Sequence, residues 1–77
     1  MSTTGYSLQK LPLGQTATIV AILTEGLMRR RLLDLGFIPG TRITAILQSP
    51  LKDPVAYLVK GALIALRKEE TEQIIVQ

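Results

Sequence analysis

Few residues in this chain could do chemistry: an arginine triplet at positions 29–31 and three glutamates, Glu69, Glu70 and Glu72. The 77 residues include no cysteine and no histidine, which excludes disulfides, thiolate metal sites, nucleophilic cysteine and imidazole acid–base catalysis. Transition-metal sites usually recruit imidazole or thiolate besides carboxylates, so we expect the glutamates to lie on a solvated bend between Arg67 and Gln73. The sequence therefore predicts no catalytic, metal-binding or cofactor-binding residue. It predicts that the protein is not an enzyme.

The arginine triplet falls in a predicted helix from Glu25 to Leu35. Thr24 could cap its first turn, and Gly36 would end it in a left-handed conformation. At about 100° per residue, three consecutive arginines point in different directions and cannot form one concentrated phosphate-binding patch. A solvated helix surface is therefore favoured over a phosphate contact or protein docking. The buried stripe of the helix is expected to be Met28, Leu32 and Leu35.

The rest of the chain reads mainly as β-strands around an aliphatic core. Hydrophobic residues make up 47% of the sequence, with only one Phe and two Tyr. Strands are predicted at 16–23, 41–47, 55–59, 62–66 and 73–77, the last returning to pair with the first. Pro39 and Gly40 fit the two central positions of a type II turn. In the segment after this turn, Ile43, Ala45 and Leu47 are expected to face inward.

These elements suggest a small five-stranded barrel with one inserted helix. A chain of this length is expected to form a single domain, since domains rarely split below roughly 100 residues. We predict a flexible N-terminal tail at residues 1–6 and one domain at residues 7–77. No apolar run approaches the roughly 18 residues of a membrane-spanning helix, so the sequence predicts a soluble, intracellular protein.

Two stretches are candidate interaction surfaces. A two-residue hairpin turn at Lys60 and Gly61 would place Leu58 opposite Leu63 on the outer face, where polar residues are usual. Such a face is either covered by other parts of the chain or used for self-association, giving a homo-oligomer, or for partner docking. The second stretch is the proline-rich loop before the hairpin, which is either a tight structural turn or a docking loop. It comprises Pro50, Leu51, Lys52, Asp53 and Pro54.

Three segments together carry a family resemblance: "RRLLDLGFIPGT", "SPLKDPV" and "LVKGALIALRKEETEQIIV". In this order and spacing they resemble the FeoA family, ferrous iron transport protein A, over residues 7–76. The resemblance implies an SH3-like barrel, also similar to the C-terminal domain of iron-dependent repressors. It further implies a cytoplasmic accessory or regulatory protein of ferrous iron uptake. Its partner would be the membrane GTPase FeoB, which could recruit it to the inner face of the membrane.

The chain departs from the family pattern at two places. Lys52 stands where the family commonly has glycine, so we expect no positive φ at that position. Leu58 and Leu63 stand where the family often has charged side chains, so the outer leucines are a feature of this sequence.

A nucleic-acid-binding small barrel is the alternative function. The net charge of +3 and the sequence pI near 9.7 are compatible with it. Single-strand binders, however, need aromatic side chains on which bases stack. The chain offers only Tyr6, Phe37 and Tyr57, of which the last two are expected in the core. The sequence therefore favours a protein-binding module and predicts no nucleic acid partner.

Overall fold

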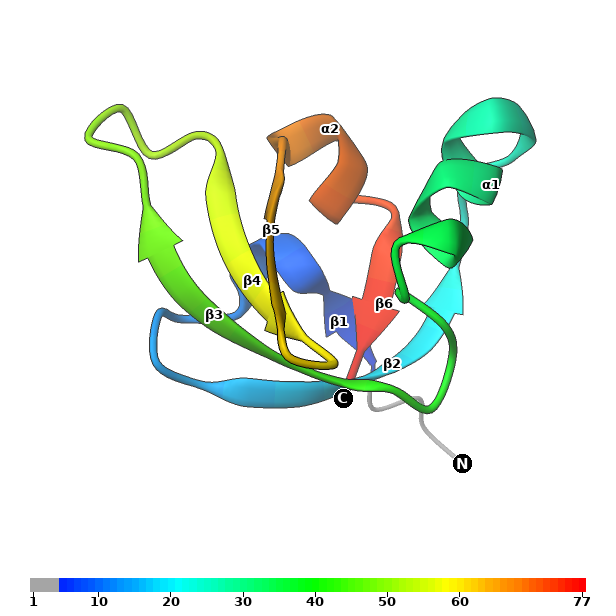
Figure 1. Ribbon diagram of the computed structural model, residues 1–77, viewed down its shortest axis with the longest axis horizontal. Coiled ribbons are helices and arrows are strands. Elements are labelled where there is room, and N and C mark those ends of the chain that lie inside the picture. Colours follow the sequence, from blue (N-terminus) through cyan, green and yellow to red (C-terminus); the bar gives the residue numbers. More distant parts are fainter. Residues whose placement is uncertain (1–4) are drawn as a thin grey trace.

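The computed structural model describes residues 5–77, and within them six antiparallel strands form one curved sheet in the order β1-β6-β2-β3-β4-β5 (Figure 1). The mainly β class is thus confirmed. The strands are β1 Tyr6–Ser7, β2 Thr16–Ile22, β3 Arg42–Gln48, β4 Val55–Val59, β5 Ala62–Leu66 and β6 Ile74–Val76. The helices are the 3-10 helix η1 Leu8–Lys10, α1 Gly26–Asp34 and α2 Lys68–Thr71.

The five predicted strands correspond to β2 through β6, and β6 pairs with β2 as expected. Three short elements were not predicted: strand β1, the 3-10 helix η1 and helix α2. Residues 1–4 of the predicted tail lie outside the described residues. Tyr6, at the end of that tail, pairs with Val76 in the sheet.

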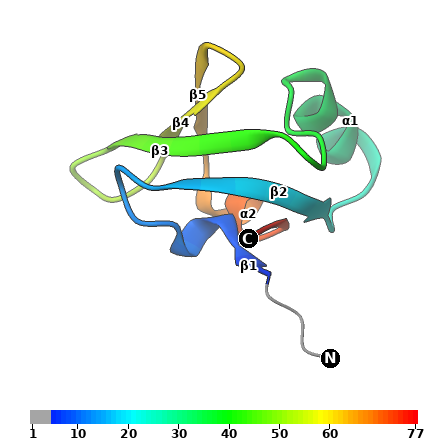
Figure 2. The same ribbon diagram turned by 90° about the horizontal axis from the view of Figure 1, so that it is seen from below.

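Strands β2 and β3 run side by side through the centre of the molecule (Figure 2). Helix α1 lies at one end of this pair, and the loop between β3 and β4 lies at the other end (Figures 1 and 2). The arginine triplet and the proline-rich loop therefore occupy opposite ends of the molecule.

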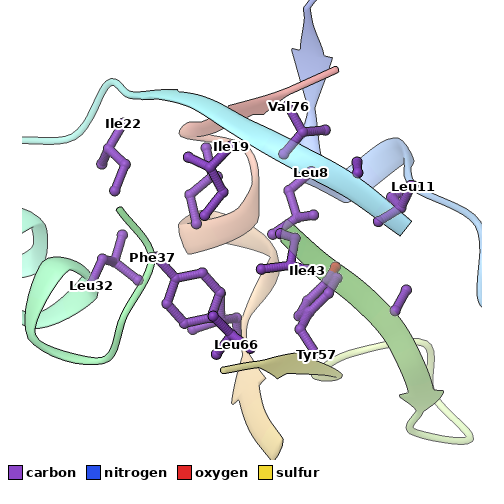
Figure 3. Packing of buried hydrophobic residues seen from close by; sticks show 14 residues of the cluster. Leu8, Leu11, Ile19, Ile22, Leu32, Phe37, Ile43, Tyr57, Leu66 and Val76 are labelled. Atoms are coloured by element: carbon purple, nitrogen blue, oxygen red, sulfur yellow. The ribbon is translucent and has the colours of Figure 1, made fainter. Parts of the chain in front are cut away.

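The core is aliphatic, as the composition indicates, with Phe37 and Tyr57 as its largest side chains. Phe37 lies between Leu32 of α1 and Leu66 of β5, so it joins the helix to the hairpin (Figure 3). The buried hydrophobic residues are Leu8, Leu11, Ala17, Ile19, Ile22, Leu32, Phe37, Ile43, Ala45, Tyr57, Val59, Leu66, Ile74 and Val76.

The turn predicted at Pro39 and Gly40 is present. Thr41 N–H donates to the Ile38 carbonyl at 2.9 Å, and Gly40 has the positive φ of 96° that glycine accepts at no steric cost. The Gly40 N–H also donates to the carbonyl of Ile19 at 2.7 Å, which joins the turn to β2.

The predicted helix forms, but its N-terminus and buried side differ from the prediction. Thr24 is not the cap: Glu25 holds that position, and its side chain makes no capping bond. Leu32 is fully buried, but Leu35 is only partly buried and Met28 is 37% exposed. The stripe is narrower than predicted because the helix contacts the core through its C-terminal turn. Gly36 ends the helix with a positive φ, as predicted.

Leu47 was predicted to face inward, and this is wrong: it is 58% exposed. The register of β3 against β4 shifts between Ala45 and Leu47. A bulge of this kind adds one residue and reverses the sides on which later residues point. Sequence alternation alone could not reveal the extra residue.

Candidate functional site

The hairpin register was predicted correctly. Leu58 pairs with Leu63, and Ala56 pairs with Ala65. The two leucines are 41% and 54% exposed, so they form an apolar outer surface on β4 and the edge strand β5. We call Ala56, Leu58, Leu63 and Ala65 the leucine face. The turn residues Lys60 and Gly61 both have positive φ, which matches the twist of a two-residue hairpin.

The proline-rich loop is held by its own backbone. Ser49 N–H donates to the Pro54 carbonyl at 3.0 Å, and Lys52 N–H donates to the Ser49 carbonyl at 2.7 Å. The expectation that Lys52 needs no positive φ is wrong, because its φ is 73°. This left-handed conformation costs a lysine more than a glycine, since its Cβ crowds the backbone. The loop thus keeps the shape that glycine would favour, with a lysine in its place.

Asp53 joins this loop to α2. One of its carboxylate oxygens accepts a hydrogen bond from the Lys68 backbone N–H at 2.8 Å, and the other lies 3.4 Å from Nη1 of Arg67. The two segments are 15 residues apart in sequence. The carboxylate therefore fixes the position of the loop relative to the start of α2. Of the other loop residues, Pro50 and Leu51 are exposed, and Leu51 is 87% exposed.

A cavity of about 370 Å³ lies between the loop, η1 and α2, on the opposite side of the hairpin from the leucine face. Apolar side chains of β4 and β5 and the polar ends of the surrounding segments line it. The lining residues are Gln9, Gln48, Leu51, Lys52, Asp53, Val55, Tyr57, Leu66, Lys68 and Thr71.

Two buried residues with a hydroxyl line this cavity, Tyr57 at 1% exposed and Thr71 at 2%, and the Thr71 hydroxyl donates to the Lys68 carbonyl at 3.2 Å. Burial, with a smaller contribution from the Asp53 carboxylate, raises the pKa of the Tyr57 hydroxyl to about 12. The hydroxyl is therefore protonated at neutral pH and can donate a hydrogen bond.

The arginine triplet does not form one patch, in agreement with the prediction. Arg29 donates to the carbonyl of Ile22 at 2.8 Å, and Arg30 lies 3.8 Å from Asp34 in an exposed pair. Arg31 pairs with Glu70. Each arginine thus has a different structural partner, and the triplet offers no single site for a phosphate.

Glu70 corrects the prediction of a solvated glutamate bend. It is 7% exposed, and its Oε1 accepts the Arg67 backbone N–H at 2.9 Å, which caps α2. Glu69 and Glu72 are exposed, as expected. In the described part of the chain, no group of three metal-ligating side chains comes together.

Sequence reasoning placed Tyr57 in the core but missed the cavity around it. Of its lining residues, the loop members Leu51, Lys52 and Asp53 were candidates for either a structural turn or partner docking, whereas Gln9, Gln48, Lys68 and Thr71 were not singled out. One signal was available: a tyrosine at an inward position of a strand brings a hydroxyl that needs a polar environment. No local pattern indicates that η1, the loop and α2 converge there.

None of the helices at residues 5–77 has the length and apolar character that crossing a membrane requires.

The family model of the FeoA domain matches residues 6–77. The chain belongs to the FeoA family. It is 37% identical, over 70 residues and 91% of its length, to the Fe(2+) transport protein A/Fe(2+) transporter FeoB fusion protein of Porphyromonas gingivalis. The chain spans 8% of the length of that fusion protein. The FeoA family is linked to ferrous iron transport.

Solved FeoA structures share the fold. FeoA from Chlorobium tepidum is 34% identical, with a TM-score of 0.87 over 92% of this chain and 68% of that one. FeoA from Stenotrophomonas maltophilia, an SH3 domain protein complexed with zinc, is 27% identical with a TM-score of 0.82 over 92% and 88% of the two chains. The predicted SH3-like fold is confirmed.

The predicted similarity to iron-dependent repressors is also found. T. acidophilum IdeR is 27% identical, with a TM-score of 0.87, and the match covers all of this chain and 35% of IdeR.

Proposed function

We propose that this FeoA-family chain is a cytoplasmic accessory protein of ferrous iron uptake that binds the transporter FeoB and is recruited by it to the inner face of the membrane. The observation that carries the proposal is the Porphyromonas gingivalis fusion protein, in which a segment similar to this chain is joined to FeoB. In a fusion, the covalent link keeps the two domains at a high effective concentration. Separate chains that act together lack this link, so they need a surface through which they bind each other.

The leucine face supports such a surface. Its leucines are exposed on neighbouring strands at the edge of the sheet, and contiguous exposed apolar side chains are typical of contact sites. The exposed tip of the proline-rich loop, Leu51, is a second apolar anchor on the other side of the hairpin. Because these surfaces are separate, they can be tested independently.

The decisive experiment is co-purification of the tagged chain with FeoB from solubilised membranes. The double variant Leu58→Lys with Leu63→Glu should retain its circular dichroism spectrum and lose FeoB. A matched control, Leu13→Lys with Leu27→Glu, changes two other exposed leucines to the same residues and should bind like the unaltered chain. Failure of the unaltered chain to bind FeoB would refute the proposal, and loss of binding only in the control pair would move the docking surface away from the hairpin.

The regulatory part of the proposal concerns GTP hydrolysis by FeoB. We expect the hydrolysis rate to change when the chain is added and to return to its basal value with the leucine-face double variant. An unchanged rate at saturating concentrations would limit the chain to a passive binding role.

A further inference from the structure

The Tyr57 hydroxyl makes no hydrogen bond to any residue in the described range 5–77. No fully buried side-chain polar atom in that range lacks a partner, so this hydroxyl must open into the cavity that Tyr57 lines. A donor on a side chain that is 1% exposed is held rigidly by the core around it. The cavity therefore contains a preorganised hydrogen-bond donor that the fold itself does not use.

The charges around this donor are unbalanced. Lys52 and Lys68 both line the cavity, and neither side chain forms an ion pair with another described residue. The single lining carboxylate, Asp53, is already engaged by Arg67 and by the Lys68 backbone N–H. Two exposed lysines of the lining thus have no ion-pair partner among the described residues, and the cavity favours an anionic group over a cation.

The composition of the cavity favours a carboxylate. Phosphate sites commonly use arginine forks or arrays of backbone N–H groups, and no arginine lines this cavity. Gln9 and Gln48 add neutral amides to the lining, with Gln48 Nε2 donating to the Lys52 carbonyl at 3.4 Å, and Val55 and Leu66 are apolar. An acidic side chain, with an apolar stem and a single charged end, matches this combination.

We propose that the cavity bounded by Tyr57, Lys52 and Lys68 binds the carboxylate of a glutamate or aspartate in an extended segment of a partner polypeptide. This inference rests on the proposed docking function and specifies a second contact in addition to the leucine face. The Tyr57 hydroxyl and the two ammonium groups donate to the carboxylate oxygens. The exposed Leu51 at the loop tip packs against the segment that carries the acidic residue.

The test uses nuclear magnetic resonance titration of the isotopically labelled chain with the capped tripeptide acetyl-Ala-Glu-Ala-amide. The backbone signals of Gln48, Asp53 and Lys68 should shift saturably, and acetyl-Ala-Gln-Ala-amide should leave them unchanged. Equal responses to both peptides would overturn the proposal, as would no response. Tighter binding of inorganic phosphate would overturn the carboxylate assignment, and equal binding of acetate would overturn the peptide source.

Variants locate the site. Tyr57→Phe and Lys68→Gln should each weaken binding of the glutamate peptide, and together by roughly tenfold or more, because they remove a buried donor and a cation. Lys60→Gln, which removes an ammonium group at the hairpin turn outside the cavity, should bind like the unaltered chain. Unchanged affinity in the double variant, with the backbone spectrum showing an intact fold, would refute the assignment.

Co-purification separates this inference from the docking function. If FeoB retains the unaltered chain and retains less of the Tyr57→Phe, Lys68→Gln double variant, both the docking function and the cavity assignment are supported. Equal retention of the two would overturn the cavity assignment and leave docking intact. If FeoB retains neither, docking to FeoB fails, and the peptide titration still decides whether the cavity selects carboxylates.

Discussion

On the β4–β5 hairpin, Tyr57 and Leu66 face the core and line a cavity, whereas Leu58 and Leu63 point outward from the same two strands. Neighbouring residues in a strand point to opposite faces, so each strand contributes to both surfaces. The inner face carries a buried polar group, the Tyr57 hydroxyl, and the outer face carries two exposed apolar side chains, Leu58 and Leu63. Both departures from the usual pattern mark surfaces that folding alone does not explain.

The largest expected difference between the two faces concerns stability. Leu66→Ala should lower the free energy of unfolding by about 2–5 kcal/mol, because Leu66 is fully buried and its loss leaves a cavity. Leu63→Ala, on the same strand and 54% exposed, should cost about 0.5 kcal/mol or less. Urea denaturation of both variants measures the difference. Similar losses would mean that the leucine face is covered in the folded protein.

Asp53 holds the proline-rich loop, which forms one side of the cavity, so substituting Asp53 is expected to lower the stability of the fold. Asp53→Ala removes the acceptor of the Lys68 N–H and the partner of Arg67, and should cost about 1–2 kcal/mol. Asp53→Asn keeps an acceptor oxygen and should cost less. Thermal unfolding ranks the two variants, and an equal melting temperature for both would show that the hydrogen bond to Lys68 contributes little.

A substitution at Lys52 is expected to raise the stability of the fold. Lys52→Gly should stabilise the fold by about 0.5–1 kcal/mol, because glycine adopts the observed φ of 73° without steric cost. Lys52→Ala should give no such gain, since alanine keeps the Cβ. Chemical denaturation compares the two, and a gain in both variants would assign the effect to the lost charge instead of the backbone.

The smallest effect at neutral pH is expected from Tyr57→Phe, which removes a hydroxyl with no hydrogen-bond partner among residues 5–77 and should change stability by less than about 0.5 kcal/mol. At high pH the effect becomes visible. The pKa of Tyr57 is raised in the fold from its ordinary 10.0 to about 12, so its protonated form is favoured by folding. This contribution is complete below pH 10 and is lost as the pH rises through 12.

Unfolding free energies of the unaltered chain and of Tyr57→Phe, measured from pH 8 to pH 12, isolate this contribution because all other titrating groups are shared. The unaltered chain should lose stability relative to the variant above about pH 10. Parallel curves would show that the hydroxyl is more solvated than its burial indicates.

Local patterns were sufficient to predict the hairpin and the turn at Gly40. Lys60 and Gly61 specify a two-residue turn, and the turn fixes every pair in β4 and β5. Leu32 could be predicted as buried from helical spacing. These features depend on residues close together in the sequence, where steric preference and alternation decide the outcome.

Features set by distant contacts could not be predicted. Glu70 looked solvated in its charged segment, but Arg31, 39 positions away, pairs with it. The positive φ of Lys52 occurs in a loop that Asp53 ties to Lys68, 15 positions away. The cavity depends on three segments meeting. In each case tertiary structure overrides the local preference of the residue.

The pairing of Tyr6 with Val76 brings the beginning and end of the fold to adjacent strands. Figure 1 shows the C-terminus at the edge of the molecule opposite the β3–β4 loop and both α-helices. Folds whose first and last strands pair in this way commonly tolerate circular permutation and insertion into other proteins. A linker attached after Gln77 would leave from this edge, so a tethered copy of this domain could turn its β3–β4 loop and the cavity beside it toward a neighbouring domain without unpairing a strand.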